Sequence, residues 1–145
     1  MSELDLPRWA TELLRDTRTA HLATADSGGR PLVVAICYVF DGELLYSAID
    51  AKPKTTRWLR RVRNIDENPR VSLIVDHWDE DWTRLCHVIV GGEATLVEGG
   101  HEWHRAIEAL QGKYEQYRAM SAESDFGCVI RIEPRTVRCW RADNA

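Results

Sequence analysis

The chain has 145 residues, of which 44% are hydrophobic and 29% are charged, and this length and composition fit one globular domain spanning residues 1–145. No apolar run approaches the roughly 20 residues of a transmembrane helix, and the start of the chain lacks the apolar core of a secretory signal, so we expect a cytoplasmic protein that does not act at a membrane. The net charge of −4 argues against nucleic acid as the partner, because affinity for a polyanion grows with the number of phosphates neutralised.

The chain opens with a predicted short helix over residues 6–19. Pro7 suits the beginning of a helix because of its fixed φ and missing N–H. Behind it, apolar side chains recur at helical spacing, namely Trp9, Leu13 and Leu14.

Three β-rich runs follow the helix. Turn residues separate them, and an Asp-Gly pair between hydrophobic runs is a strong hairpin signal. The runs cover residues 20–26, 30–40 and 43–50, with Ser-Gly-Gly at 27–29 and Asp-Gly at 41–42. They predict a meander of three antiparallel strands.

Positive charge gathers in the next segment. Twelve consecutive residues, 52–63, contain about a third of the 19 Lys and Arg residues and no acid; the cations are Lys52, Lys54, Arg57, Arg60, Arg61 and Arg63. Their confinement to one segment of an acidic chain favours a small anionic ligand over a long polyanion.

The same segment predicts an amphipathic helix with Lys52 as its N-cap and Pro53 at its first position. Asn68-Pro69 would end it. One face is shared by Thr55, Trp58, Leu59, Val62 and Ile65, and the other by Lys54, Arg57, Arg61 and Asn64.

A phosphate site is the favoured interpretation of this helix start. The backbone N–H groups of Lys54, Thr55 and Thr56 would have no partner inside the helix, and the helix dipole places positive charge there. The alternative is a solvated amphipathic face without a ligand.

The second half of the chain predicts further strands and one helix. The run 83–99 fits either a hairpin turning at Gly91-Gly92 or one long strand bent there by a bulge. The other elements are a strand at 70–78, an amphipathic helix at 101–120 with Trp103, Ile107 and Leu110 inside, and a hairpin around Glu133-Pro134 within 126–142. Strands and helices do not alternate, so we expect a mainly β (α+β) fold, an antiparallel barrel with peripheral helices.

Other polar clusters indicate no metal site. Residues 76–82, DHWDEDW, lack the glycine and distal Glu of a calcium loop; Trp78 and Trp82 there suit a surface contact, a ring-stacking site or a dimer edge. His101, His104 and Glu108 share one helical side, but their spacing favours a solvated face over a metal. The four cysteines, widely spaced and without a CxxC pair, favour buried reduced thiols; they are Cys37, Cys86, Cys128 and Cys139.

Catalytic motifs are absent from the sequence. There is no GxSxG, no Walker loop and no GxGxxG after a strand, and no nucleophile stands beside an evident base. The catalytic residues are therefore unknown, and any chemistry belongs to a cofactor that the protein holds.

Residues 10–98 resemble a known family. The motifs HLATAD, GGRP, DAKPK, NPRVSLIVD and DEDW, in this order, are similar to those of the pyridoxamine 5′-phosphate oxidase-like split β-barrel superfamily, and more narrowly of its actinobacterial branch that uses the deazaflavin coenzyme F420. This resemblance implies a six-stranded Greek-key barrel and a homodimer with a cofactor at each subunit interface.

The resemblance also implies which residues bind the cofactor. It assigns the phosphate to Lys52, Lys54, Thr55 and Thr56, with Arg57 and Arg61 nearby. It places the ring along Pro31, Val33 and Ala35 of the second strand and along Ser47, Ala48 and Ile49 of the third. A neighbouring subunit would close over the ring with Trp78 and Trp82.

The cofactor implied is coenzyme F420. The strand Arg and Lys that relatives using flavin mononucleotide (FMN) bring to the phosphate are missing from PLVVAICYVF, and the extra arginines suit a polyglutamyl tail. The expected function is hydride transfer to a small or planar organic acceptor. The alternatives are an FMN-dependent oxidoreductase and a non-catalytic carrier of flavin, deazaflavin or heme; a nucleic-acid module is disfavoured.

Overall fold

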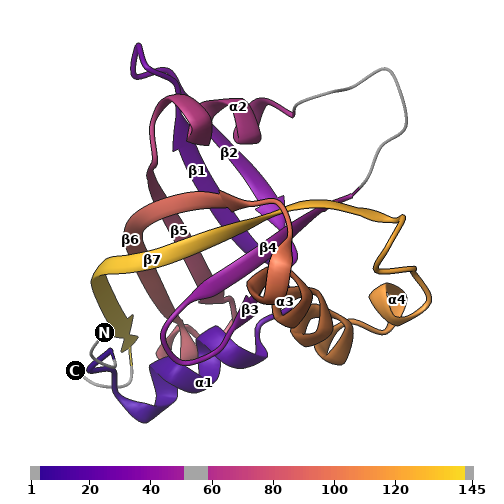
Figure 1. Cartoon of the computed structure of the whole chain (residues 1–145). Helices are drawn as coiled ribbons and strands as arrows, with labels where there is room; N and C mark the ends of the chain where they lie inside the picture. Colours follow the sequence, from indigo (N-terminus) through magenta and orange to yellow (C-terminus); the bar gives the residue numbers. More distant parts are fainter. Residues whose placement is uncertain (1–3, 51–58, 143–145) are drawn as a thin grey trace.

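The computed structural model describes residues 4–50 and 59–142. Its seven described strands form one antiparallel sheet in the order β2-β1-β5-β6-β7-β4-β3. The sheet curls into a half-barrel, with α1 across one end, α2 at the other and α3 against β3, β4 and β7 (Figure 1). This architecture confirms the mainly β antiparallel split barrel with peripheral helices.

The strands are β1 (Ala20–Ala25), β2 (Pro31–Ile36), β3 (Val39–Phe40), β4 (Leu45–Asp50), β5 (Arg70–His77), β6 (Cys86–Val97) and β7 (Phe126–Arg141). The helices are α1 (Arg8–Asp16), α2 (Arg60–Glu67), α3 (Gly100–Lys113) and α4 (Glu115–Arg118), with a 3₁₀ turn η1 (Trp82–Arg84). No described helix is both long and apolar enough to cross a membrane.

Alternating apolar side chains fill the barrel. Leu22, Leu73 and Val90 of neighbouring strands all point inward and are buried, as the period-two geometry of strands requires. On the other side of β4, the predicted inner face of α3, including Trp103 and Leu110, forms a second apolar cluster. Strand β4 is therefore covered on both faces, which fixes its position in the sheet.

The predicted meander is wrong at its middle run. That run divides after Ile36, so that β2 pairs with β1 while β3 pairs with β4, and these two pairs lie at opposite ends of the sheet. Tyr38 explains the break: its backbone N–H donates to the Tyr114 hydroxyl (3.0 Å), and its own hydroxyl donates to the Leu14 carbonyl. Because these bonds go to α1 and to the junction of α3 and α4 rather than to a strand, the ladder is interrupted here, and the number of described strands is seven instead of the six expected.

Strand β6 is the long bent strand, not the hairpin, of the two predicted alternatives. The register with β7 shifts between Gly91 and Gly92, where a Cβ on Gly92 would stand 2.4 Å from the Glu133 carbonyl oxygen. The hairpin predicted at Glu133-Pro134 is wrong, because β7 runs through it without turning. Pro134 lies opposite Gly92 at the bulge, a place in a sheet where the missing N–H of proline is tolerated.

Helix α2 starts later than predicted. Arg60 is its first residue, and Leu59 before it is extended (φ −68°, ψ 153°), so a continuous helix from Pro53 is wrong. Asn64 is not on a polar face either: it is only 1% exposed, and its Nδ2 donates to Thr24 Oγ1 (3.0 Å). Asn64 is therefore not part of the basic side of the helix, on which Arg60 and Arg63 are exposed.

The helix predicted at 101–120 divides into α3 and α4 at Tyr114. This residue is extended (φ −115°, ψ 117°), and its hydroxyl donates to the Arg18 carbonyl (2.7 Å). Beside it, Lys113 Nζ donates to the carbonyls of Thr17 (2.7 Å) and Tyr38 (3.0 Å). These bonds fasten the C-terminal end of α3 to the barrel.

Candidate functional site

A cavity of about 350 Å³ lies where β2 and β4 approach α2 and α4. One side of its lining comes from the ends of β2 and β4 and consists of Ala35, Ile36, Cys37, Ser47, Ala48 and Asp50. The other side consists of Leu59 just before α2, Arg61 of α2 and Tyr117 of α4. The cavity therefore combines segments that are far apart in the sequence.

Arg61 brings positive charge into the cavity. Its Nε is buried and has no hydrogen-bond partner among residues 4–50 and 59–142. Burial lowers the pKa of the guanidinium, and the nearby Asp50 carboxylate opposes that shift. A buried donor without an acceptor has lost its bond to water without a replacement, so an acceptor or anion entering the cavity would restore that bond.

Ser47 shapes the wall of the cavity. The residue is buried, and its hydroxyl donates to the Cys37 carbonyl (2.8 Å). This bond joins β4 to the residue after β2 and holds the two strand ends together. Because the hydroxyl proton is used in this bond, Ser47 can only accept a hydrogen bond from a ligand.

Tyr117 contributes a phenol to the cavity. Burial, and then the neighbouring Cys37 thiol, raise its pKa above the ordinary range. Its ring packs edge-to-face against Tyr114 (5.5 Å between centroids) and Phe126 (5.2 Å). Tyr117 is therefore a fixed, neutral hydroxyl that can donate a hydrogen bond into the cavity.

Four of the predicted site residues meet in this cavity: Ala35, Ser47, Ala48 and Arg61. The other described ones lie outside its lining. Pro31 and Val33 are exposed further along β2, and Ile49 is buried in the barrel core. Their predicted role in cofactor binding stays a prediction.

The predicted tryptophans lie at the connection between β5 and β6. Trp78 and Trp82 are 61% and 66% exposed and meet edge-to-face at 6.4 Å between centroids. Neither lines the cavity of its own chain, so any contact with a cofactor there would have to come from a second copy.

The predicted phosphate site falls outside the described residues. It comprises Lys52, Lys54, Thr55, Thr56 and Arg57. The described residues on either side of that segment, Asp50 and Leu59, both line the cavity.

Several cavity residues were not predicted. Cys37 continues the period-two series Pro31, Val33, Ala35 and could have been found by extending it. Tyr117 has no local signal, because only the packing of α4 brings it to β2 and β4. Cys37 is also exposed, contrary to the prediction of buried thiols, and none of the four cysteines, all in the described part of the chain, forms a disulfide.

The other polar clusters offer no metal site within residues 4–50 and 59–142. His101 and His104 are exposed on α3. In the acidic turn, the Asp81 carboxylate accepts from the Thr83 N–H (3.1 Å) and from its hydroxyl (2.7 Å). Asp81 thus caps η1.

The cavity fits part of a phosphate-bearing cofactor. Its volume is near the lower end of the roughly 300–1,000 Å³ usual for ligand sites, so a large cofactor would extend beyond it. The free donor of Arg61 suits an anionic group. The short side chains of Ala35 and Ala48 leave room for a flat ring.

A curled antiparallel sheet with this strand order and peripheral helices defines the split-barrel class of fold. The family model described as pyridoxamine 5′-phosphate oxidase matches residues 6–141. The chain therefore belongs to the pyridoxamine 5′-phosphate oxidase family. The comparison with curated proteins found no match.

Solved structures show the same fold. The conserved hypothetical protein Rv2991 from Mycobacterium tuberculosis is 24% identical (TM-score 0.75; 97% of this chain and 87% of that chain covered). HutZ, the heme storage protein from Vibrio cholerae, is 22% identical (TM-score 0.73; 95% of each chain). A structure named F420 reductase is 24% identical (TM-score 0.64; 92% and 98%). At these identities the likeness establishes the fold.

Proposed function

We propose that the protein binds coenzyme F420 at the Arg61 cavity and reduces a small or planar organic acceptor. The reduced deazaflavin would supply the hydride, as cofactors generally carry the difficult chemistry. The observation that carries the proposal is the buried, unpartnered Nε of Arg61 in a cavity between strand ends. The likeness to the F420 reductase supports it.

The chain's own residues would bind and orient the cofactor. Arg61 would take an anionic group, together with the Lys52–Arg57 segment. The exposed Arg60 and Arg63 could attract the polyglutamyl tail, because surface cations concentrate anions by long-range attraction. Tyr117 would donate a hydrogen bond to the ligand, and no side chain is assigned as the proton donor.

A homodimer would complete the site. Val33 on the outer side of β2 is 63% exposed. Its cross-strand partner Ala23 is small, and so is Ser72, which pairs with Ala23 on the next strand. An exposed apolar side chain among small residues favours contact with another protein surface. If a second copy binds at this surface, Trp78 and Trp82 of one subunit would be available to cover the cofactor ring bound to the other subunit.

Titration with coenzyme F420, FMN and hemin tests the proposal. We expect saturable binding that is tightest for the deazaflavin. Replacing Arg61 by Gln should weaken it about 10- to 100-fold, since a hydrogen bond to a charged group contributes about 1.5–3 kcal/mol. Arg105→Gln, an exposed position on α3, is the matched control and should leave affinity unchanged. Absence of F420 binding, or equal affinity in the Arg61→Gln variant, would reject the site.

Heme handling is the second candidate function. Cys37 lines the cavity, and Cys is among the side chains that ligate heme iron; the likeness to HutZ agrees with this. Hemin binding without F420 binding would favour the carrier. Single-turnover oxidation of bound, reduced F420 by a panel of acceptors separates an enzyme from a carrier of the same cofactor.

A further inference from the structure

One wall of the Arg61 cavity is carried by the connection between α3 and β7. This connection, residues 114–125, includes the short helix α4, and we call it the α4 segment. In Figure 1 it lies beside the barrel. None of its residues is buried, although Tyr117 lines the cavity. Tyr117 therefore reaches the cavity from a segment outside the apolar core.

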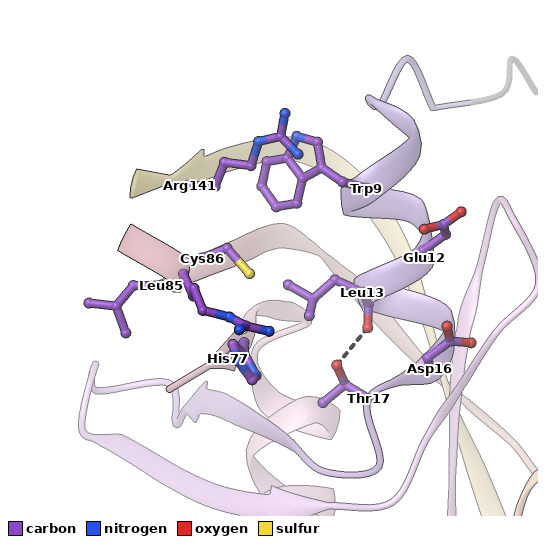
Figure 2. Close-up of a pocket in the computed structure, with 10 residues that line it drawn as sticks. Trp9, Glu12, Leu13, Asp16, Thr17, His77, Leu85, Cys86 and Arg141 are labelled. Atoms are coloured by element: carbon purple, nitrogen blue, oxygen red, sulfur yellow. Dashed lines mark hydrogen bonds between the residues drawn. The ribbon is translucent and has the colours of Figure 1, made fainter. Parts of the chain in front are cut away.

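Both ends of the α4 segment are fixed to the barrel. At its start, the Tyr114 hydroxyl donates to the Arg18 carbonyl (2.7 Å). Arg18 directly follows Thr17, whose hydroxyl donates to the Leu13 carbonyl at the end of α1 (2.6 Å; Figure 2). Beyond its other end, Phe126 of β7 is buried in the second apolar cluster. Movement of the segment is thus confined to the residues between these two anchors.

Hydrogen bonds rather than burial hold the middle of the α4 segment. Gln111 of α3 donates through Nε2 to the carbonyls of Tyr117 and Met120, both at 3.2 Å. In return, the Arg118 guanidinium donates to the carbonyls of Gln111 (2.8 Å) and Gly112 (3.2 Å). Tyr117 and Met120 pack against the second apolar cluster but stay partly exposed. Since water replaces such hydrogen bonds at small net cost, and few apolar contacts would be lost, the middle of the segment can open locally.

Opening of the α4 segment would uncover Arg61. The Tyr117 phenol lies close enough to act on the guanidinium: burial lowers the pKa of Arg61, and Asp50 and then Tyr117 oppose that shift. The facing wall cannot move in the same way, because Ala35 and Ala48 belong to strands that are paired in the sheet. The cavity can therefore widen on the α4 side without loss of strand pairing.

We propose that the α4 segment is a lid, which opens between its fixed ends to admit a ligand to Arg61 and closes with Tyr117 on that ligand. Gln111 and Arg118 form the latch that keeps it closed. The cavity of about 350 Å³ is small for the cofactor proposed above, and the open lid provides the additional space. The inference rests on the proposal that this cavity is the binding site, but not on which ligand binds.

Chemical access to Arg61 in the ligand-free protein tests the lid. Phenylglyoxal, a small planar reagent for guanidinium groups, is followed at each arginine by peptide mass spectrometry. In wild type we expect Arg61 to react more slowly than Arg63, which is exposed on the same helix. Gln111→Ala should speed the reaction of Arg61 about tenfold, the effect of one to two neutral hydrogen bonds, and leave Arg63 unchanged. Arg118→Ala should act in the same direction, and Glu108→Ala, at an exposed position of α3, is the matched control without effect.

Amide hydrogen exchange shows whether the segment opens locally. We expect residues 115–125 to exchange about tenfold faster in Gln111→Ala, while exchange in α3 and β7 stays as in wild type. Binding of coenzyme F420 to the wild-type protein should slow exchange in 115–125, because the ligand is held under the closed lid.

The lid is overturned if Arg61 of the wild type reacts as fast as Arg63, or if both latch variants leave the reaction of Arg61 unchanged. Faster exchange throughout the protein in those variants would also overturn it, because Gln111 and Arg118 would then stabilise the whole fold. The measurements on the ligand-free protein need no cofactor. A failure of F420 to bind would therefore reject the proposed function and leave the test of the lid intact.

Discussion

Asp26 shows how one carboxylate fixes a turn. It is 6% exposed and accepts hydrogen bonds from the N–H groups of Gly28 and Arg30 and from Arg30 Nε, all at 2.9 Å. The pKa of Asp26 is lowered, chiefly by the bonds from the Arg30 backbone and then its side chain. The turn between β1 and β2 therefore depends on an ionised carboxylate.

The stabilisation by Asp26 should depend on pH. Since its pKa is lower in the folded state than in the unfolded chain, where it is about 3.9, the contribution is fully present well above pH 4 and is lost as the pH falls through the folded value. We expect Asp26→Asn to lower the free energy of unfolding in urea at pH 7, and the difference from wild type to shrink at pH 3. The exposed Asp66→Asn is the control. A difference that is constant with pH would show that the charge of Asp26 contributes nothing.

At the scale of elements, the bulge between β6 and β7 depends on Gly92. A Cβ there would lie 2.4 Å from the Glu133 backbone oxygen, whereas a Cβ on Gly112 of α3 would meet nothing within 4 Å. We expect Gly92→Ala to cost at least about 1–3 kcal/mol of unfolding free energy, and Gly112→Ala to be neutral or to stabilise by up to about 1 kcal/mol. Thermal and urea unfolding measure both, and equal effects would mean that the two strands separate easily at the bulge.

At the scale of the whole molecule, the proposed dimer face can be tested through Val33. Placing a charge there should weaken self-association, because a buried unpaired carboxylate is costly at an interface. We expect Val33→Asp to shift the protein toward monomer in analytical ultracentrifugation, while Ala109→Asp, at an exposed position of α3, does not. If Val33→Asp and wild type associate alike, the outer side of β2 is not the interface.

The whole molecule also shows which features could be predicted. Alternation of apolar residues and the Asp41-Gly42 turn were enough for β1, β4 and β5, because those signals are local. The break at Tyr38 depends on Leu14 and Tyr114, so it could not be read from residues 30–40. The cavity could likewise be predicted only in part. The strand residues Ala35 and Ala48 could be predicted from the strand pattern and the family resemblance, but only tertiary packing brings Tyr117 to the cavity.

The position of β7 in the sheet determines when the fold and the Arg61 cavity can form during synthesis. This strand, the last of the described strands, lies between β6 and β4 (Figure 1). Until it docks, the β4–β3 hairpin has no strand partner linking it to the β2-β1-β5-β6 sheet. The Arg61 cavity draws on both β2 and β4, so a chain on the ribosome cannot present a finished binding site before residues 126–141 have emerged. Ligand can therefore assist only the final step of folding, and a chain truncated before β7 gains no stability from it.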